Sequence, residues 1–184
     1  MELRDLANAV LPHVAAAAAG GVAVAAALLP HVQTQRSRKR EVARAFAVHI
    51  IEVQDTLQRA GQSFDLIASG EGRDILIYFK TLPHVVPLHT LGSFTETAAA
   101  CSVLPCYKDV RDAVVVVTAL SSAHRELADQ AGRPKALALI MNRQETYRRD
   151  LHRALDKCRD TLRTLRAYAP GDTVRAIDAT LVRR

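Results

Sequence analysis

The helical character of this chain is clearest in residues 42–67, VARAFAVHIIEVQDTLQRAGQSFDLI. Apolar or weakly polar side chains recur there at steps of three or four residues, which is the spacing of one face of an α-helix. The positions on this face are Val42, Phe46, His49, Val53, Leu57, Ala60, Phe64 and Ile67. The sequence therefore predicts a long helix over residues 36–68 that buries one face against other helices.

The chain beyond residue 68 shows the same spacing in several further segments. Residues 75–79 could form a strand by propensity, but no convincing partner strand exists, so we expect a helix there. Residues 114–117 are also strand-like, but their flanks keep the helical spacing, so we expect a helix there too. Asp74 and Ser93 stand where N-caps are expected, and Glu96, three residues after Ser93, has the spacing of a capping box. Pro83 and Pro87 mark an irregular connector between them. The predicted helices cover residues 75–82, 93–104, 107–130, 135–167 and 172–182.

The predicted helix over residues 135–167 has a regular apolar seam. Leu151, Leu155, Cys158, Leu162 and Leu165 follow one another at steps of four and three. The same register passes upstream through Arg148 and Gln144, so the heptad pattern is imperfect. We therefore expect an all-α bundle in which this helix packs on neighbours, and not an autonomous coiled coil.

The N-terminal region has a different composition, with no charged residue from Leu6 to Gln35. A helix needs about 20 apolar residues to cross the hydrocarbon layer of a membrane, and residues 11–32 supply that length. The sequence therefore predicts a transmembrane helix, although its many alanines favour lipid only weakly. A cleaved signal peptide and an alanine-rich helix packed inside a soluble protein are the alternatives.

Charges beside the apolar run predict its orientation. Arg36, Arg38, Lys39 and Arg40 follow the run directly, whereas residues 1–5 contain one arginine and two acidic residues. Because positive residues accumulate on the cytoplasmic side, we expect a single-pass protein of the plasma or inner membrane with its N-terminus outside. The C-terminal region would then lie in the cytoplasm, next to the lipid bilayer.

The sequence therefore predicts three parts, an N-terminal tail and anchor (residues 1–35), a bundle (36–168) and a short C-terminal helix (169–184). Small residues in the anchor, such as Ala16 and Gly20, are spaced four apart and could pair two anchors. A homo-oligomer is therefore one expected partner. An unidentified cytoplasmic or membrane protein is another.

Cysteines and histidines are the candidates for chemistry. Cys101, Cys106 and Cys158 lack the closely spaced pairs of a zinc site, and we expect buried, reduced thiols. His49 lies on the apolar face of its helix and is expected to be a hydrogen-bonded core residue. His124, close to Glu126, is expected on a solvated helix surface. A sensor role for His49, His124, Cys101 and Cys106 remains the alternative.

Familiar catalytic and nucleotide-binding motifs are missing from the sequence. There is no nucleophile elbow, no phosphate-binding glycine loop and no dinucleotide fingerprint, so we expect no enzyme, cofactor or metal. Residues 143–166 are rich in arginine, but acidic residues interleave with them, and the chain has four Tyr, four Phe and no Trp for base stacking. We therefore expect a solvated charged helix face and not a nucleic-acid partner.

Two functions remain after these tests. The first is a membrane-anchored helical scaffold or interaction protein, which should have a filled core and an exposed apolar groove. The second is a small-ligand or redox-responsive sensor, which should enclose a cavity lined by the candidate histidines and cysteines.

Overall fold

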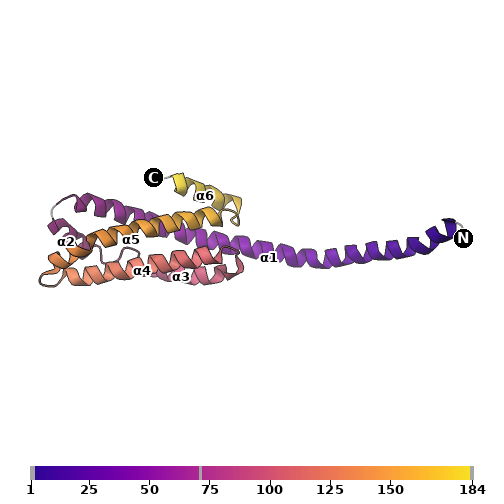
Figure 1. Ribbon diagram of the computed structural model, residues 1–184, viewed down its shortest axis with the longest axis horizontal. Coiled ribbons are helices and arrows are strands. Elements are labelled where there is room, and N and C mark those ends of the chain that lie inside the picture. The colour runs from indigo at the N-terminus through magenta and orange to yellow at the C-terminus, as the bar shows by residue number, and fades with distance from the viewer. Residues whose placement is uncertain (1–2, 71, 183–184) are drawn as a thin grey trace. The chain divides into compact units, whose positions relative to one another are not determined.

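The structure, a computed structural model, describes the backbone of residues 3–70 and 72–182 and the side chains of residues 33–70 and 72–182. These residues form helices and no strand, which confirms the predicted all-α class. The chain divides into two compact units, Met1–Arg38 and Lys39–Arg184. The elements in chain order are α1 (Leu3–Ala68), α2 (Gly72–Thr81), α3 (Leu88–Ala100), the 3-10 helix η1 (Cys101–Val103), α4 (Tyr107–Ala131), α5 (Ala136–Leu165) and α6 (Gly171–Val182), as Figure 1 shows.

In the part of the chain whose side chains are described, no helix is both long and apolar enough to cross a membrane. The predicted transmembrane segment, residues 11–32, lies outside that part and gains no support from it. The backbone of α1 continues as a helix through Pro30. A proline removes one backbone hydrogen bond, and the turns on either side keep theirs.

The short helices begin earlier than the sequence predicts. α2 starts at Gly72, which places Asp74 in its first turn, where a carboxylate favours the positive end of the helix dipole, and not at the N-cap. α3 starts at Leu88 after Pro87, so Ser93 lies inside the helix and the predicted capping box is wrong. The buried face of α3 consists of Thr90, Phe94 and Ala98, and it begins about one turn before Ser93.

The long helices α4 and α5 match their predicted positions closely and run side by side in opposite directions (Figure 1). All five residues of the predicted α5 seam are buried, with at most 6% of each residue exposed. Upstream of the seam, Tyr147 and Ile140 take over the buried positions, and Gln144 and Arg148 lie beside them. Residues one position away from the interrupted heptad pattern therefore continue the buried face of α5.

The core of the second unit is filled by side chains from all its helices. Phe46 of α1 stacks on Phe94 of α3, with ring centroids 5.1 Å apart. Gly61 allows α1 to approach α5, since a Cβ atom at this position would lie 3.3 Å from Cδ2 of Leu151. Arg166, just after α5, forms a two-pronged ion pair with Asp178 of α6, at 2.7 and 3.1 Å. These contacts hold the short helices on the long ones.

Candidate binding groove between α4 and α5

His124 is fully buried, so the prediction that it lies on a solvated surface is wrong. Its Nδ1 atom is 2.8 Å from the hydroxyl oxygen of Tyr147, and its Nε2 atom hydrogen-bonds the carbonyl oxygen of Leu82. Because a carbonyl oxygen only accepts, Nε2 carries the proton and the Tyr147 hydroxyl donates to Nδ1. Both ring nitrogens are therefore occupied by the protein itself.

Burial keeps the His124 ring neutral. Loss of solvent lowers the pKa of His124, against the opposing hydrogen bond to Leu82, and burial also raises the pKa of Tyr147. Next to them, the Tyr78 hydroxyl donates to the carbonyl oxygen of Ala60 at 3.2 Å. This polar cluster joins α1, α2, α4 and α5, so its evident role is to hold the bundle together.

The cysteines are buried and unpaired, as the sequence predicts. Burial, with the neighbouring Cys106, raises the pKa of Cys101 to about 12, and burial raises the pKa of Cys106 as well. Thiols of this kind are poor nucleophiles at neutral pH. Cys106 also precedes α4, in which His124 lies 18 positions further on, or about 27 Å along the helix. The predicted sensor residues are therefore not gathered around one cavity.

His49 is half-buried in α1. The side chain of His49 is 29% exposed, and its Nδ1 atom is 4.0 Å from Oε2 of Glu52. Nδ1 is a buried atom but makes no hydrogen bond in the described part of the chain, so the hydrogen bond predicted for His49 is not found at this atom. Of the four predicted membrane-flanking residues, Lys39 is half-buried, and the exposed ones are Arg36, Arg38 and Arg40.

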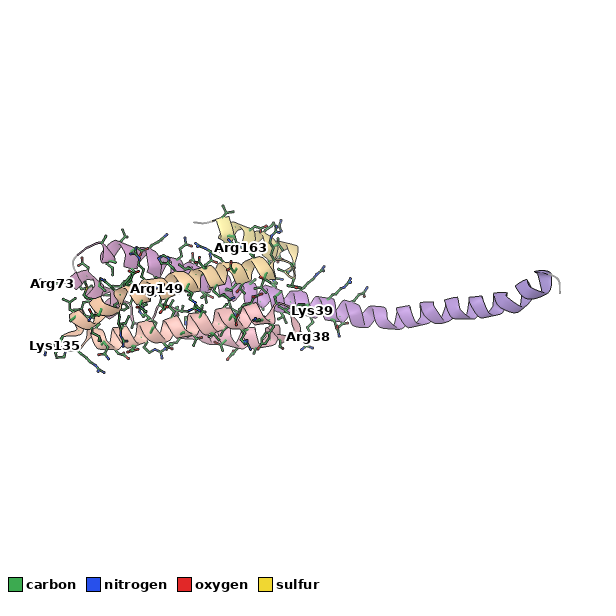
Figure 2. The ribbon with its side chains drawn as sticks, in the orientation of Figure 1. Arg38, Lys39, Arg73, Lys135, Arg149 and Arg163 are labelled. Carbon is green, nitrogen blue, oxygen red and sulfur yellow. The ribbon has the colours of Figure 1, made fainter. Side chains whose placement is uncertain are left out.

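Metal-binding geometry is not found among the described residues, where no three His, Cys, Asp or Glu side chains are close enough to hold an ion. The basic side chains of the second unit are spread along it and not gathered in one patch. Figure 2 shows Arg73 and Lys135 at one end, Arg163 toward the other and Arg149 between them.

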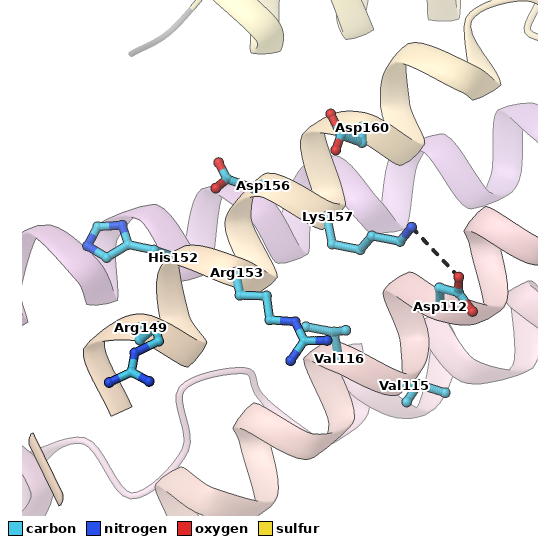
Figure 3. A pocket seen from close by; sticks show the side chains of 9 residues that line it. All are labelled: Asp112, Val115, Val116, Arg149, His152, Arg153, Asp156, Lys157 and Asp160. Carbon is cyan, nitrogen blue, oxygen red and sulfur yellow. Dashed lines mark ion pairs between the residues drawn. The ribbon is translucent and has the colours of Figure 1, made fainter. Parts of the chain in front are cut away.

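A groove of about 630 Å³ lies between α4 and α5. On α4 the groove is lined by two valines, Val115, which is 60% exposed, and Val116, which is half-buried. The α4 sequence carries no charge from Ala113 to Ala123. The groove is lined by Asp112, Val115, Val116, Arg149, His152, Arg153, Asp156, Lys157 and Asp160, as Figure 3 shows.

Two smaller grooves continue this one along the same pair of helices. A groove of about 190 Å³ shares Val115, Val116 and Arg153 with the first. A third, of about 250 Å³, shares Asp150 with the second and extends to Leu127. We refer to the three together as the α4/α5 groove.

The charged side chains of the α4/α5 groove are partly paired. Lys157 lies 3.8 Å from carboxylate oxygens of both Asp109 and Asp112, and Arg143 lies 2.6 Å from Glu126. Arg149 and Arg153, by contrast, have no carboxylate within 4.0 Å among the described residues. In Figure 3 the Arg153 guanidinium group extends from α5 toward Val116 of α4, and Arg149 lies one turn away along α5.

No protein-family model matches the sequence, and comparisons with curated proteins and with solved structures found no match. The α4/α5 groove itself contains no cysteine or serine beside a histidine that could act as its base. Its lining combines apolar side chains of α4 with charged side chains of α5.

Sequence reasoning missed this groove, although one signal for it was present. The stripe through Val110, Val117 and Leu127 identifies the buried side of α4, and Val115 falls on the opposite side. An exposed valine within an uncharged stretch could have marked a binding face. The sequence alone could not show which part of α5 lies beside this stretch of α4, because residues 149–153 are far from it along the chain.

Proposed function

We propose that this chain is a membrane-anchored helical interaction protein and that the α4/α5 groove binds a protein partner. The groove is the observation that carries the proposal, because it presents exposed apolar surface between two long helices. A filled core and an exposed groove are what a scaffold needs, whereas a sensor needs an internal cavity. The grooves described above include none of His49, His124, Cys101 and Cys106.

The anchor rests on sequence alone. The charge-free run over residues 6–35 and the basic tetrad after it favour insertion with the second unit in the cytoplasm. An anchor of this kind confines the groove to the cytoplasmic face of the plasma or inner membrane. Small residues such as Gly20 and Gly21 also allow anchors to pair. Binding would then occur where membrane partners are concentrated.

Cross-linking tests the binding role. A photoreactive amino acid is placed at Val115 in the groove or, as the control, at Leu66 of α1, which is 76% exposed and lies outside it. Irradiation of cells that make the full chain is expected to join a protein at Val115 and not at Leu66. Equal adducts at both positions, or none at Val115, would overturn the binding role. An adduct of twice the chain mass would identify a second copy as the partner.

Fractionation tests the anchor separately. Alkaline carbonate should leave the full chain in the membrane pellet, and protease added to sealed cells should spare its C-terminus. Release by carbonate would refute the anchor, and cleavage of the C-terminus from outside would refute the orientation. Neither result depends on what the groove binds.

A further inference from the structure

We infer that the α4/α5 groove takes a helix of the partner protein that carries two acidic side chains four residues apart, held by Arg149 and Arg153. This inference rests on the proposed function and specifies the chemistry of the partner. It follows from where unmatched charge lies in the groove and from the length of the groove along α4.

Unmatched positive charge in the groove is concentrated at two positions. Arg149 and Arg153 are both exposed and are one helical turn apart on α5, which is about 6 Å along the helix axis. The other basic residues of the groove, Lys157 and Arg143, already face carboxylates. Two guanidinium groups without such partners favour carboxylates from outside, because each can bind one through two parallel hydrogen bonds.

The aspartates that line the groove beside these arginines do not cancel this charge. Asp156 and Asp160 form ion pairs within α5, at 3.6 Å to Arg159 and 2.7 Å to Arg163. Figure 3 shows both carboxylates on the side of α5 away from Val115 and Val116. Asp150 has no ion pair in the described part of the chain and lines the neighbouring stretch of the groove. It lies between Arg149 and Arg153 along α5 and favours a basic residue on the partner helix beside the acidic pair.

The dimensions favour a helix over a small anion. Asp112 and Leu127 mark the two ends of the groove on α4 and are 15 positions apart, or about 22 Å. That is the length of about four helical turns. A partner helix with acidic residues at positions i and i+4 repeats the 6 Å spacing of the two arginines. Its adjacent face would cover Val115 and Ala119, which a phosphate group would leave exposed to water.

Helical peptides provide the probe. Each peptide has about 16 residues, is held helical by a side-chain staple, and has one row of alanine and leucine beside a Glu pair spaced i, i+4. A panel moves the Glu pair through every register relative to the apolar row. In matched peptides, lysine or glutamine replaces both Glu residues. We expect the full chain in detergent to bind a Glu peptide about tenfold more tightly than its glutamine match.

Variants locate the binding. Arg149→Gln combined with Arg153→Gln should remove the preference for Glu. The control, Arg73→Gln combined with Arg133→Gln, changes the net charge equally at exposed residues outside the groove and should retain the preference. Nuclear magnetic resonance signals of the Val115 and Val116 methyl groups should shift on binding, whereas those of Val48 on α1 should not.

Several results would overturn the inference. These are equal binding of the lysine peptides, failure of every register to bind, and an equal loss of affinity in the control variant. Binding of a single-stranded oligonucleotide or of phosphatidylglycerol vesicles that requires Arg149 and Arg153, without Glu-peptide binding, would assign the site to phosphate. If Val115 cross-links to a protein but the Glu peptides do not bind, this inference fails and the proposed function stands. If Val115 forms no adduct, the proposed function itself fails.

Discussion

The hydroxyl group of Tyr147 on α5 donates a hydrogen bond to Nδ1 of His124 on α4, over 2.8 Å, inside the bundle core. Both residues are at most 2% exposed. The two side chains can form this hydrogen bond only because α4 and α5 pair in antiparallel directions. The bond therefore reports directly on whether α4 and α5 are in register, which is also the condition for the groove on their outer side.

Tyr147→Phe should lower the free energy of unfolding by about 1–3 kcal/mol, because it leaves a buried acceptor on His124 without a donor. Tyr107→Phe is the matched control, since the Tyr107 side chain packs against the core but its hydroxyl makes no hydrogen bond in the described part of the chain. That variant should stay within about 0.5 kcal/mol of the parent. Urea denaturation of the full chain measures both, and equal effects would contradict the assigned role of the bond.

Acid should destabilise the protein through His124. Burial lowers the pKa of this ring in the folded state, so below about pH 6.5 the unfolded chain binds a proton that the folded chain does not. The stability that the neutral His124 ring contributes is fully present above about pH 6.5 and is lost as the pH falls toward its folded-state pKa. Between pH 6.5 and 5.5, the parent should lose more stability than His124→Gln does, by up to about 1 kcal/mol. The exposed His152→Gln should behave like the parent, and equal losses in parent and His124→Gln would refute this explanation.

The three cysteines should react slowly with a thiol reagent in the native protein. Burial raises the pKa of Cys158 to about 12, as it does for Cys101, so few thiolates exist near pH 8. In denaturant, all three cysteine thiols should react promptly, as measured by the absorbance change of an aromatic disulfide reagent. Fast native reaction at Cys101 or Cys106 would instead support the redox-responsive alternative.

Two glycines should respond oppositely to added side chains. Gly61→Val should destabilise the fold by about 1–3 kcal/mol, because its Cβ alone would lie 3.3 Å from the Leu151 side chain. Gly92→Ala in α3 should stabilise it by about 0.5–1 kcal/mol, since nothing lies within 4 Å and alanine favours a helix. Thermal unfolding measures both changes. If Gly61→Val left the stability unchanged, α1 and α5 would have to lie further apart than they do in the structure.

Local pattern was enough to identify the helices. Residues three and four positions apart share a helix face, so apolar stripes such as that through Phe46, Val53 and Phe64 reveal the buried side without any knowledge of the partner. The all-α class and the extents of α4 and α5 follow from such patterns. The start of α3 did not, because a capping-box motif at Ser93 also fits inside a helix whose buried face begins upstream.

Polar residues inside the bundle could not be placed in the same way. Gln54 is fully buried, and both atoms of its amide lack hydrogen-bond partners in the described part of the chain. His124 is buried because Leu82 and Tyr147 approach it from segments far along the chain. A sequence pattern records the polarity of a side chain and not the partners that compensate for its burial.

What the sequence by itself determined is the helical fold and the buried side of each long helix, since both depend on neighbours within a turn. The formal net charge of +6 is likewise a matter of composition. Only the tertiary structure decided that Arg149 and Arg153 of α5 face Val115 of α4 across one groove. Those residues are more than 30 positions apart, and only the packing of the bundle sets the rotation and register that bring them together.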